Sequence, residues 1–345
     1  MKIALIGQNF DRECGQGVAK YSGELYESLK ERREDTKKIE LGSSKNPLKT
    51  LFNNIFVSLV QTLSLKSRVY HFLMPEVAFP CFVKRPSIVT VYDLIPLILK
   101  NERRKSFNLF FKIMLSFVKR ADHLIVISKS TERDVIKYLG VPKENISLIY
   151  PGVDHNVFFP LKRKKNKKFT VGFLSGFSQR KNAKILLEVA EMLKEEDIVF
   201  KIGGKGGSNE LKNIKERKGL KNINFIGFIP DKNLNKFYNS LDLFIVPTTY
   251  DGFSMPGLES MACGCPIITS NTGALVEVAG SAGITVNPNN AKEIAEAIIK
   301  IKSYPNLIKK MRMGSLKHAK TFSWEKCTRK TMEVYEKFLK GPYKR

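Results

Sequence analysis

Short apolar runs recur along the first half of the chain, separated by segments whose charged residues follow helical spacing. Each run has the length of a buried strand, and segments such as Ala19–Arg32 and Thr131–Leu139 have the period of an amphipathic helix. This alternation predicts a parallel sheet covered by helices on both faces. The predicted strands are Ile3–Ile6, Val69–Phe72, Ile88–Tyr92, Leu124–Ser128 and Ile146–Tyr150.

The pattern stops at residues 161–168, where six of eight residues are basic, and then a second series of the same kind begins. The basic run is a linker candidate. The second set of predicted strands is Phe169–Leu174, Val199–Ile202, Ile223–Ile226, Leu243–Val246, Ile267–Thr269 and Gly283–Val286. The helices predicted to connect them include Lys184–Lys194, Leu234–Ser240, Met255–Ala262 and Ala291–Ser303.

We therefore expect an α/β protein with two doubly wound, Rossmann-like domains that face each other across a cleft. No strand follows the last helical segment, Ser323–Leu339, which we expect to return to the first domain. A chain of 345 residues has room for about two domains. The predicted boundaries are 1–160 for the first domain, 161–168 for the linker, 169–322 for the second domain and 323–345 for the returning helix.

Charge is the unusual part of the composition, since 59 Lys+Arg against 33 Asp+Glu give a net charge of +26. Such an excess can serve a nucleic acid, an anionic membrane or a phosphorylated substrate, or it can be solvated surface. The five cysteines are scattered and odd in number, which favours reduced thiols and a cytoplasmic protein. The longest uncharged stretches, Thr50–Leu65 and Ser260–Val276, are too short to span a membrane.

Residues 247–266 are the most informative stretch, because they combine a strand end, a loop and the start of a helix. A helix N-terminus presents free N–H groups and a partial positive charge that suit a phosphate. Two carboxylates, Asp251 and Glu259, flank this anion site, which is reasonable if they accept hydrogen bonds from sugar hydroxyls. The residues at the helix start are Ser254, Met255 and Pro256, and Pro is well tolerated in a first helical turn.

This stretch resembles the donor-binding motif of retaining glycosyltransferases with the GT-B fold, the large group that includes bacterial and archaeal mannosyltransferases and glucosyltransferases. The family motif has two Glu residues separated by seven positions. The resemblance implies that the first acid contacts the transferred sugar and that the second contacts the nucleotide ribose. Glu259 matches the second position, whereas Asp251 replaces the first Glu with a side chain one methylene shorter. This departure leaves the identity of the donor sugar open.

The resemblance extends to three glycine-containing segments and to the segment that brackets the nucleotide base. It implies a diphosphate-binding role for the first glycine loop and for the pair Arg180 and Lys181, which must act together because no Arg lies between Arg163 and Arg180. Backbone comes close to a ligand most easily at glycine. The further residues implied to bind the donor are Gly15, Gly17, Gly204 and Phe228.

Residues 91–97 resemble a family segment that usually reads His-Asp-Leu, with the His beside the reacting sugar. Here Tyr92 replaces the His and is followed by Asp93. Tyr can hydrogen-bond a sugar hydroxyl but is not a base near neutral pH. The resemblance implies a substrate-side role for both residues. The alternatives are an ordinary buried strand tyrosine and a turn-capping aspartate.

Taken together, the resemblance implies a retaining hexosyltransferase that moves a mannose- or glucose-type sugar from a GDP- or UDP-linked donor, as in polysaccharide biosynthesis. We expect no cofactor and no metal, since no Asp-x-Asp motif of the usual kind stands out. The first domain would bind a glycan or lipid-linked acceptor and the second domain the nucleotide-sugar. A nucleotide-sugar epimerase or a phosphorylase on the same fold is one alternative. A nucleic-acid-binding protein is another alternative, although the basic residues of this chain are not interleaved with stacking aromatic residues.

Residues 45–120 carry 13 Lys+Arg but only 3 Asp+Glu, and they include the apolar segments 51–65 and 107–118. A basic and apolar face suits an anionic membrane. The protein would then sit at the inner face of the membrane as a peripheral protein. The alternative is that both segments are core helices.

Overall fold

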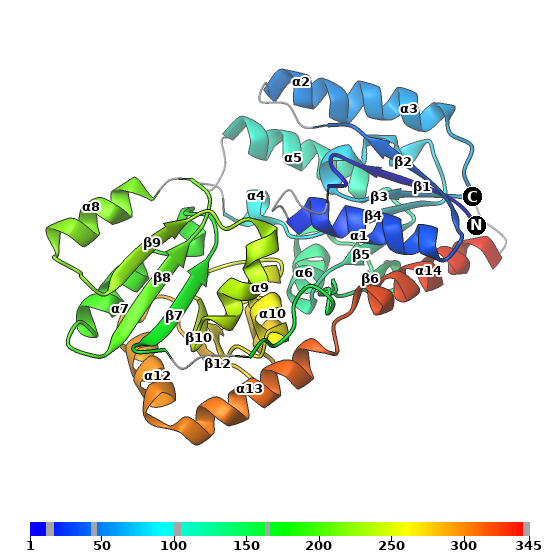
Figure 1. Ribbon diagram of the computed structural model, residues 1–345. Coiled ribbons are helices and arrows are strands. Elements are labelled where there is room, and N and C mark those ends of the chain that lie inside the picture. The colour runs from blue at the N-terminus through cyan, green and yellow to red at the C-terminus, as the bar shows by residue number, and fades with distance from the viewer. Residues whose placement is uncertain (12–16, 43–46, 100–104, 163–165, 207, 341–345) are drawn as a thin grey trace. The chain divides into compact units, whose positions relative to one another are not determined.

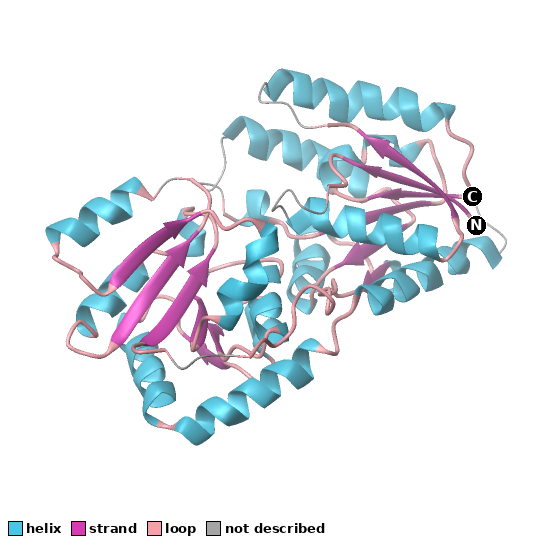
Figure 2. Ribbon diagram, in the orientation of Figure 1, coloured by secondary structure: helices cyan, strands magenta, loops and turns pink. Residues whose placement is uncertain are grey.

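The computed structural model describes the chain except for residues 12–16, 43–46, 100–104, 163–165, 207 and 341–345 (Figure 1). The chain forms two compact units. The first unit comprises Met1–Gly152 together with Ser323–Arg345, and the second comprises Val153–Phe322. Each unit has its own parallel sheet with helices on both faces (Figure 2).

The first unit is built on a six-stranded sheet in the order β2-β1-β3-β4-β5-β6, in which all neighbouring strands are parallel. Parallel strands covered on both faces must be apolar throughout, and β3, β4 and β5 are buried at every position. The strands are β1 (Lys2–Gly7), β2 (Asp35–Glu40), β3 (Val69–Phe72), β4 (Ser87–Val91), β5 (His123–Val126) and β6 (Ile146–Leu148).

Strand β2 was not expected from the sequence, which predicts five strands here. It lies at the edge of the sheet, and Ile39 is its one fully buried residue. A charged edge strand lacks the apolar pattern by which buried strands are recognised, and charge at an edge also discourages pairing with other chains.

Helices and short helical turns connect these strands. They are α1 (Gly17–Glu31), α2 (Pro47–Phe52), the π-helical turn η1 (Asn53–Val57), α3 (Ser58–Ser64), the 3₁₀ turns η2 (Pro75–Val77) and η3 (Phe79–Phe82), α4 (Ile95–Ile98), α5 (Lys105–Val118), α6 (Lys129–Asp134), the π-helical turn η4 (Val135–Leu139), the 3₁₀ turn η5 (Lys143–Asn145) and α14 (Trp324–Lys340). The core on one face of the sheet includes the buried side of α5.

Helix α14 belongs to the first unit, which confirms the expected return of the C-terminal helix. The Tyr335 hydroxyl lies 2.7 Å from Nδ1 of His71 in β3, and Nε2 of His71 lies 2.8 Å from the Thr90 hydroxyl in β4. At the start of the helix, the Trp324 ring packs edge-on against the Tyr21 ring of α1, with centroids 5.7 Å apart. A polar contact and an aromatic contact therefore hold α14 against this unit.

The second unit repeats the plan with strand order β12-β11-β10-β7-β8-β9, again with parallel neighbours. All six strands expected from the sequence are present: β7 (Phe169–Leu174), β8 (Ile198–Gly203), β9 (Ile223–Gly227), β10 (Leu243–Val246), β11 (Ile267–Ser270) and β12 (Ile284–Val286). The helical elements are the 3₁₀ turn η6 (Gln179–Lys181), α7 (Ile185–Met192), α8 (Asn209–Arg217), α9 (Asp231–Asn239), α10 (Met255–Ala262), α11 (Leu275–Ala279), α12 (Ala291–Ser303) and α13 (Pro305–Ala319).

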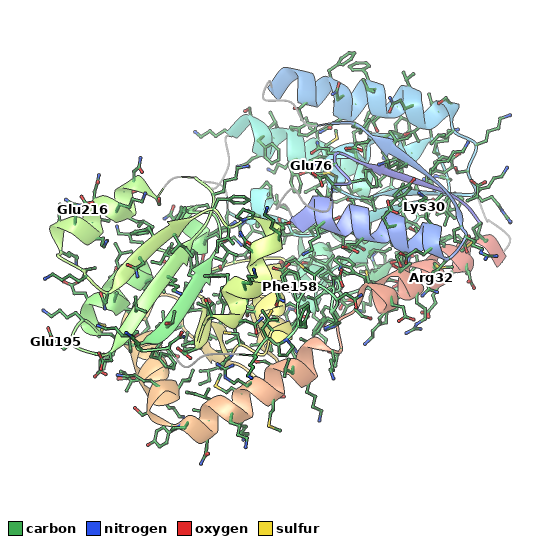
Figure 3. The ribbon with its side chains drawn as sticks, in the orientation of Figure 1. Lys30, Arg32, Glu76, Phe158, Glu195 and Glu216 are labelled. Atoms are coloured by element: carbon green, nitrogen blue, oxygen red, sulfur yellow. The ribbon has the colours of Figure 1, made fainter. Side chains whose placement is uncertain are left out.

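The division between the units falls at Gly152/Val153, upstream of the boundary predicted at 160/161. Phe158 is 2% exposed, lies inside the second unit (Figure 3) and packs against Tyr238 of α9. Asn239 of the same helix donates to the carbonyl of Phe159 at 3.0 Å and accepts from the amide of Leu161 at 2.7 Å. The described part of the basic run 161–168 thus lies within the second unit rather than at the division, because the residues before it are already fixed to α9.

Candidate functional site

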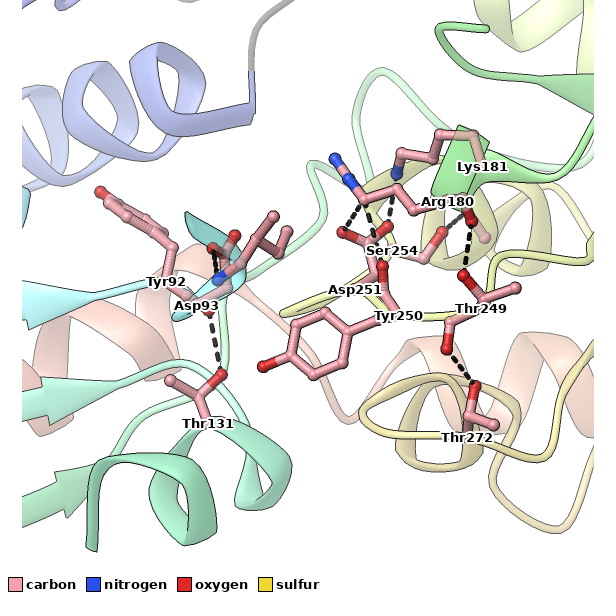
Figure 4. A network of polar contacts seen from close by, with 12 residues as sticks. Tyr92, Asp93, Thr131, Arg180, Lys181, Thr249, Tyr250, Asp251, Ser254 and Thr272 are labelled. Carbon is pink, nitrogen blue, oxygen red and sulfur yellow. Dashed lines mark hydrogen bonds and ion pairs between the residues drawn. The ribbon is translucent and has the colours of Figure 1, made fainter. Parts of the chain in front are cut away.

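The site in the second unit forms where β7 and β10 end, because the segment after each strand carries charged side chains. Turn η6, which follows β7, carries Arg180 and Lys181, and the loop after β10 carries Asp251. Lys181 Nζ donates to Asp251 Oδ2 at 2.5 Å, and Arg180 Nη1 donates to Asp251 Oδ1 at 3.2 Å (Figure 4). Asp251 is only 8% exposed. A carboxylate this deeply placed needs such partners, since an unpaired buried charge is strongly unfavourable.

The turn that carries the two cations is fixed to the loop after β10 by polar contacts. Asn182 closes the turn in the left-handed conformation, with φ +55°, which Asn adopts more readily than most residues. Its amide donates to the carbonyl oxygens of Pro247 (3.2 Å) and Pro288 (2.7 Å). The Arg180 carbonyl accepts from the Thr249 amide at 2.8 Å. Sequence reasoning missed Asn182 and Thr249, although an Asn beside a basic pair at a turn was a usable signal.

Helix α10 begins directly after this loop, with Ser254 as its N-cap. The Ser254 hydroxyl accepts from the Gly257 amide at 3.3 Å, which satisfies one of the free N–H groups of the first turn. Met255 and Pro256 occupy that first turn, which contains no acidic residue. The positive end of the helix dipole is therefore not neutralised by a side chain of its own first turn.

Glu259, one turn further along α10, is 4% exposed and accepts a hydrogen bond at 3.0 Å from the Tyr238 hydroxyl of α9. Burial raises the pKa of Tyr238 well above its ordinary value, and the nearby charge of Glu259 raises it further. Tyr238 therefore remains a protonated donor at any physiological pH. Sequence reasoning missed Tyr238, because a Phe-Tyr pair on a helix has the pattern of core residues.

Two predicted donor-binding residues follow β8 and β9. Gly204 has φ +156°, and a Cβ atom there would lie 1.7 Å from the Ser175 carbonyl oxygen, so only glycine fits. Gly204 N donates to the Gly227 carbonyl at 2.9 Å, which holds the loops after β8 and β9 together. Phe228 follows Gly227 and is 54% exposed, so its ring is accessible to a ligand.

The predicted residues of the first unit have different surroundings. Gly15 lies outside the described residues. Gly17 opens α1, and a Cβ atom there would meet no described protein atom within 4 Å, so a close approach of the donor to this glycine stays a prediction. The Tyr92 ring packs edge-on against the Tyr21 ring at 5.4 Å, and its hydroxyl is buried. Asp93 Oδ1 accepts from the Ile95 amide at 2.9 Å and so caps the turn before α4.

Burial raises the pKa of Tyr92 well above its ordinary value, so the side chain is neutral. Its backbone carbonyl accepts from the Thr131 hydroxyl at 2.9 Å (Figure 4). Both contacts fit the alternative interpretation of a packed tyrosine, although Tyr92 lies one residue beyond the end of β4 and not in the strand. A sugar contact by Tyr92 or Asp93 stays a prediction, and this arrangement of the two side chains lends it no support.

Two family matches cover most of the chain. Residues 156–317 match Glycosyl transferases group 1, and residues 69–157 match Glycosyltransferase Family 4. The chain belongs to the GT-B glycosyltransferases. It is therefore a member of a family of transferase enzymes.

Individual proteins agree with this assignment. An uncharacterized glycosyltransferase of Methanocaldococcus jannaschii (MJ1178) is 27% identical over 274 residues, which cover 77% of this chain and 74% of that protein. O-antigen chain mannosyltransferase B of Escherichia coli is 36% identical over 114 residues, covering 33% of this chain and 30% of that protein. Sucrose-phosphate synthase from Thermosynechococcus elongatus has the same fold, with a TM-score of 0.84, 19% identity and coverage of 98% of this chain and 99% of that structure.

The arrangement in this glycosyltransferase has two chemical capacities. The Arg180–Lys181 pair and the start of α10 offer positive charge and N–H donors to an anion. Asp251 and Glu259 offer oxygen acceptors to hydroxyl groups. Among the described residues, no group of three or more His, Cys, Asp or Glu side chains could hold a metal ion. The expected metal-free reaction stays a prediction.

Proposed function

We propose that this protein is a retaining hexosyltransferase that moves a mannose- or glucose-type sugar from a nucleotide-sugar to a glycan or lipid-linked acceptor without a metal. The observation that carries the proposal is the contact of Arg180 and Lys181 with Asp251, in the loop that leads into α10. One anion-binding pair and one hydroxyl acceptor are thus joined in a single cluster. A sugar attached to a diphosphate requires both groups together.

The cations and the helix would act on the leaving group. When the anomeric C–O bond breaks, positive charge develops on the sugar and negative charge on the departing diphosphate. Arg180, Lys181 and the N–H groups near Ser254 would stabilise that negative charge, and donors placed in advance of the reaction are the most effective kind. The acceptor oxygen would attack from the face that the diphosphate leaves, while its proton passes to the leaving phosphate oxygen. This course gives retention and needs no protein nucleophile.

The buried acceptors would select the donor. Asp251 would bind a hydroxyl of the transferred sugar, Glu259 would bind the ribose, and the exposed Phe228 would lie against the base. Before the donor arrives, Asp251 pairs with both cations and offsets one of their two positive charges. Donor binding would then exchange the carboxylate for the diphosphate as the partner of Arg180 and Lys181, which leaves Asp251 available to the sugar.

A GDP-linked mannose is the donor we favour over UDP-sugars. The segment around Tyr92 and Asp93 resembles mannosyltransferase-type relatives, and a mannosyltransferase of Escherichia coli is among the similar proteins. The acceptor would be a glycan or a lipid-linked sugar, because the basic and apolar residues of 45–120 suit both phosphate groups and lipid.

The decisive experiment measures binding and transfer together. A thermal-shift panel of GDP-, UDP- and ADP-sugars identifies the donor, and the product is then examined for anomeric configuration. We expect GDP-mannose to stabilise the protein most, a retained product, and activity that a chelator leaves unchanged. An inverted product would contradict the mechanism, and epimer formation without transfer would contradict the reaction.

Lys181→Ala tests the role of the cations. We expect turnover to fall about 100-fold or more, the loss typical of one oxyanion donor. Lys184→Ala is the matched control, because Lys184 is an exposed lysine close by in the sequence that precedes α7. Near-normal turnover of Lys181→Ala, or an equal loss in both variants, would refute the assignment.

A further inference from the structure

The helical segment α2–η1–α3 carries apolar side chains on its outward face. Phe52, Phe56, Val60 and Leu63 are 54%, 57%, 66% and 49% exposed. Residues three and four positions apart share one side of a helix, so these four form a continuous strip, which we call the outer stripe. The Phe52 and Phe56 rings stack with their centroids 5.2 Å apart. These are large aromatic and aliphatic groups held in contact with water.

The most deeply buried side chains of the same segment are polar. Asn54, Ser58 and Thr62 are 1%, 0% and 0% exposed, again at helical spacing. Asn54 Oδ1 accepts from the Gln8 side chain at 2.9 Å, and the Ser58 hydroxyl donates to the Val77 carbonyl at 3.3 Å. The segment thus buries three polar side chains and leaves four large apolar ones exposed, although Val57 also packs against the core. A helix on a water-soluble surface normally turns its largest apolar side chains inward.

This pattern separates the segment from α5, the other apolar helix of the basic region. Helix α5 buries Phe111, Met114, Leu115 and Val118, so it is a core helix, although Leu109 and Ile113 are exposed. The outer stripe contributes nothing comparable to the core. Contiguous exposed apolar surface of this kind marks an interaction site.

Charge indicates what the outer stripe contacts. No Asp or Glu occurs from Leu41 to Pro75, whereas four Lys or Arg do. Two of these, Lys66 and Arg68, follow α3 and are exposed. Lys84 adds a cation beside the end of α3, where its Nζ donates to the carbonyl oxygens of Leu63 (3.0 Å) and Leu65 (3.1 Å).

We propose that the outer stripe docks on an anionic lipid surface, with the segment α2–η1–α3 lying in the plane of the interface. The apolar side chains would enter the boundary between headgroups and acyl chains, while Lys66, Arg68 and Lys84 pair with anionic headgroups. Two copies meeting through this face would bring like charges together, so charge favours lipid over self-association. Within the described part of the chain, no helix has the length and hydropathy to cross a membrane. The proposal rests on no part of the donor site.

Vesicle flotation of the full chain tests the apolar contribution. The probes are vesicles of phosphatidylcholine alone and of phosphatidylcholine mixed with phosphatidylglycerol, at low salt. We expect the protein to float with the anionic vesicles. The variant Phe52→Ser/Phe56→Ser/Val60→Ser should have a vesicle affinity at least about tenfold lower, because the apolar anchor is removed. The matched control is Tyr304→Ser/Met313→Ser in the second unit, where the two side chains are 62% and 64% exposed. Melting temperatures verify that each variant is folded.

A second pair of variants tests the charges. Lys66→Gln/Arg68→Gln is expected to weaken binding about fivefold per charge at low salt, and added salt should reduce the difference. Lys309→Gln/Lys310→Gln removes two exposed lysines from α13 and should bind like the unmodified protein. An equal loss in both double variants would mean that net charge, rather than this face, attracts the vesicle.

Three further results would overturn the proposal. The unmodified protein could fail to float with anionic vesicles at low salt, or the triple variant could float as well as the unmodified protein. Sedimentation could also show a dimer that the triple variant abolishes, which would assign the face to a second copy. Phe56→Trp adds a readout of depth, because an inserted indole is quenched by lipids with brominated acyl chains. Tyr304→Trp should not be quenched.

Discussion

Under the proposed mechanism, the surroundings of the Asp251 carboxylate change when the donor binds. In this structure two cations neutralise it, and the proposed reaction requires those cations at the diphosphate. A charge so little exposed cannot lose its partners without compensation. Diphosphate binding and sugar recognition are therefore linked through one side chain, and the link can be tested by removing its charge.

Asp251→Asn should separate binding from chemistry. We expect a free nucleoside diphosphate to bind about tenfold more tightly, because Arg180 and Lys181 no longer have a carboxylate partner to leave. Turnover should fall about 100-fold, because the sugar loses an acceptor that is charged. Calorimetric titration with GDP and UDP, beside steady-state turnover, measures both quantities.

The control for Asp251→Asn is Glu188→Gln, which removes an exposed carboxylate from α7 and should change neither quantity. Weaker diphosphate binding by Asp251→Asn, with the fold intact, would show that the carboxylate does not compete with the diphosphate. If the unmodified protein bound no diphosphate, the donor assignment itself would be wrong.

Tyr238 is expected to hold Glu259 in position through the bond between their side chains. In Tyr238→Phe the carboxylate loses a donor from a fully buried hydroxyl, and we expect the KM for the donor to rise about tenfold with kcat nearly unchanged. Tyr304→Phe is an exposed control of the same chemistry. A drop in kcat at constant KM would place Glu259 in the chemical step instead of in ribose binding.

The residues of the candidate site could be predicted unequally from the sequence. Asp251 was recognisable because motif spacing and the adjoining helix start point to the same chemistry, and the structure brings it to Arg180 and Lys181. The contact of Tyr238 with Glu259 was not recognisable, because it depends on how α9 packs on α10. The direction of the Tyr92 hydroxyl was equally hidden, because Tyr92 lies just past the end of β4 and its ring is placed by packing against Tyr21 of α1.

The close packing of the loops that follow β7 and β8 depends on Gly204, where no side chain fits. Gly204→Ala places a methyl group against the Ser175 carbonyl, so the loops must separate or distort. We expect donor binding to fall at least about tenfold and stability to fall by about 1–3 kcal/mol. Titration with the donor and chemical denaturation measure the two effects.

Gly176→Ala is the matched control, because Gly176 neighbours Ser175 and an added Cβ would meet nothing within 4 Å. Its stability should be close to that of the unmodified protein. Equal stability of the two variants would mean that the loops can rearrange without loss.

Helix α14 is joined to the first sheet by His71, which burial keeps neutral near physiological pH. Burial lowers the pKa of His71 to about 3, whereas an exposed histidine has a pKa near 6.5. Below about pH 6.5 the histidine of the unfolded chain binds a proton, whereas His71 of the folded protein stays neutral down to about pH 3. The contribution of this group to the free energy of unfolding is therefore fully present above about pH 6.5 and decreases as the pH falls towards 3. From pH 6.5 to 5 this group alone should reduce the free energy of unfolding by about 2 kcal/mol.

The check is urea unfolding of the unmodified protein and of His71→Asn at pH 7 and pH 5. The variant should be less stable at pH 7, because Tyr335 and Thr90 lose their partner, yet it should lose less stability on acidification. Parallel pH dependence in the two proteins would show that His71 does not carry this effect.

The elements recognisable from the sequence are those with strong apolar periodicity. The buried strands of both sheets were found, and so was α14, whose apolar positions recur over many turns. Strand β2 was missed because an edge strand needs few buried residues. The exposure of the outer stripe on α2–η1–α3 could not be foreseen, because periodicity identifies a helix without saying which of its faces is turned to water.

Among the described residues, two hydrophobic core clusters are each drawn entirely from one unit. The chain passes between the units at Gly152/Val153 and at Phe322/Ser323, and the Val153 amide donates to the Phe322 carbonyl at 3.4 Å. The second unit is thus a continuous segment whose two ends lie side by side. This organisation makes independent folding of that segment a direct expectation.

Residues 153–322, expressed alone, should unfold cooperatively and bind a nucleoside diphosphate with an affinity within about tenfold of the full chain. The fragment retains all of the proposed donor-binding side chains that the structure brings together in the second unit. Circular dichroism and calorimetric titration provide the two readouts. A fragment that folds but does not bind would show that the first unit supplies part of the diphosphate site.

The paired crossing points also have a consequence for how such proteins diversify. A Cβ atom on Gly152 would lie 2.1 Å from the Trp324 backbone nitrogen, so the chain leaves the first unit and re-enters it at one place. A recombination event that exchanges the coding sequence between these two points replaces the whole second unit, which is the proposed donor-binding half. It changes neither the order of strands β1–β6 nor the surface of the first unit on which α14 packs. A new donor preference can therefore be acquired by exchange of one continuous segment. The first unit, which would meet the acceptor and the lipid surface, keeps its own sequence in such an exchange.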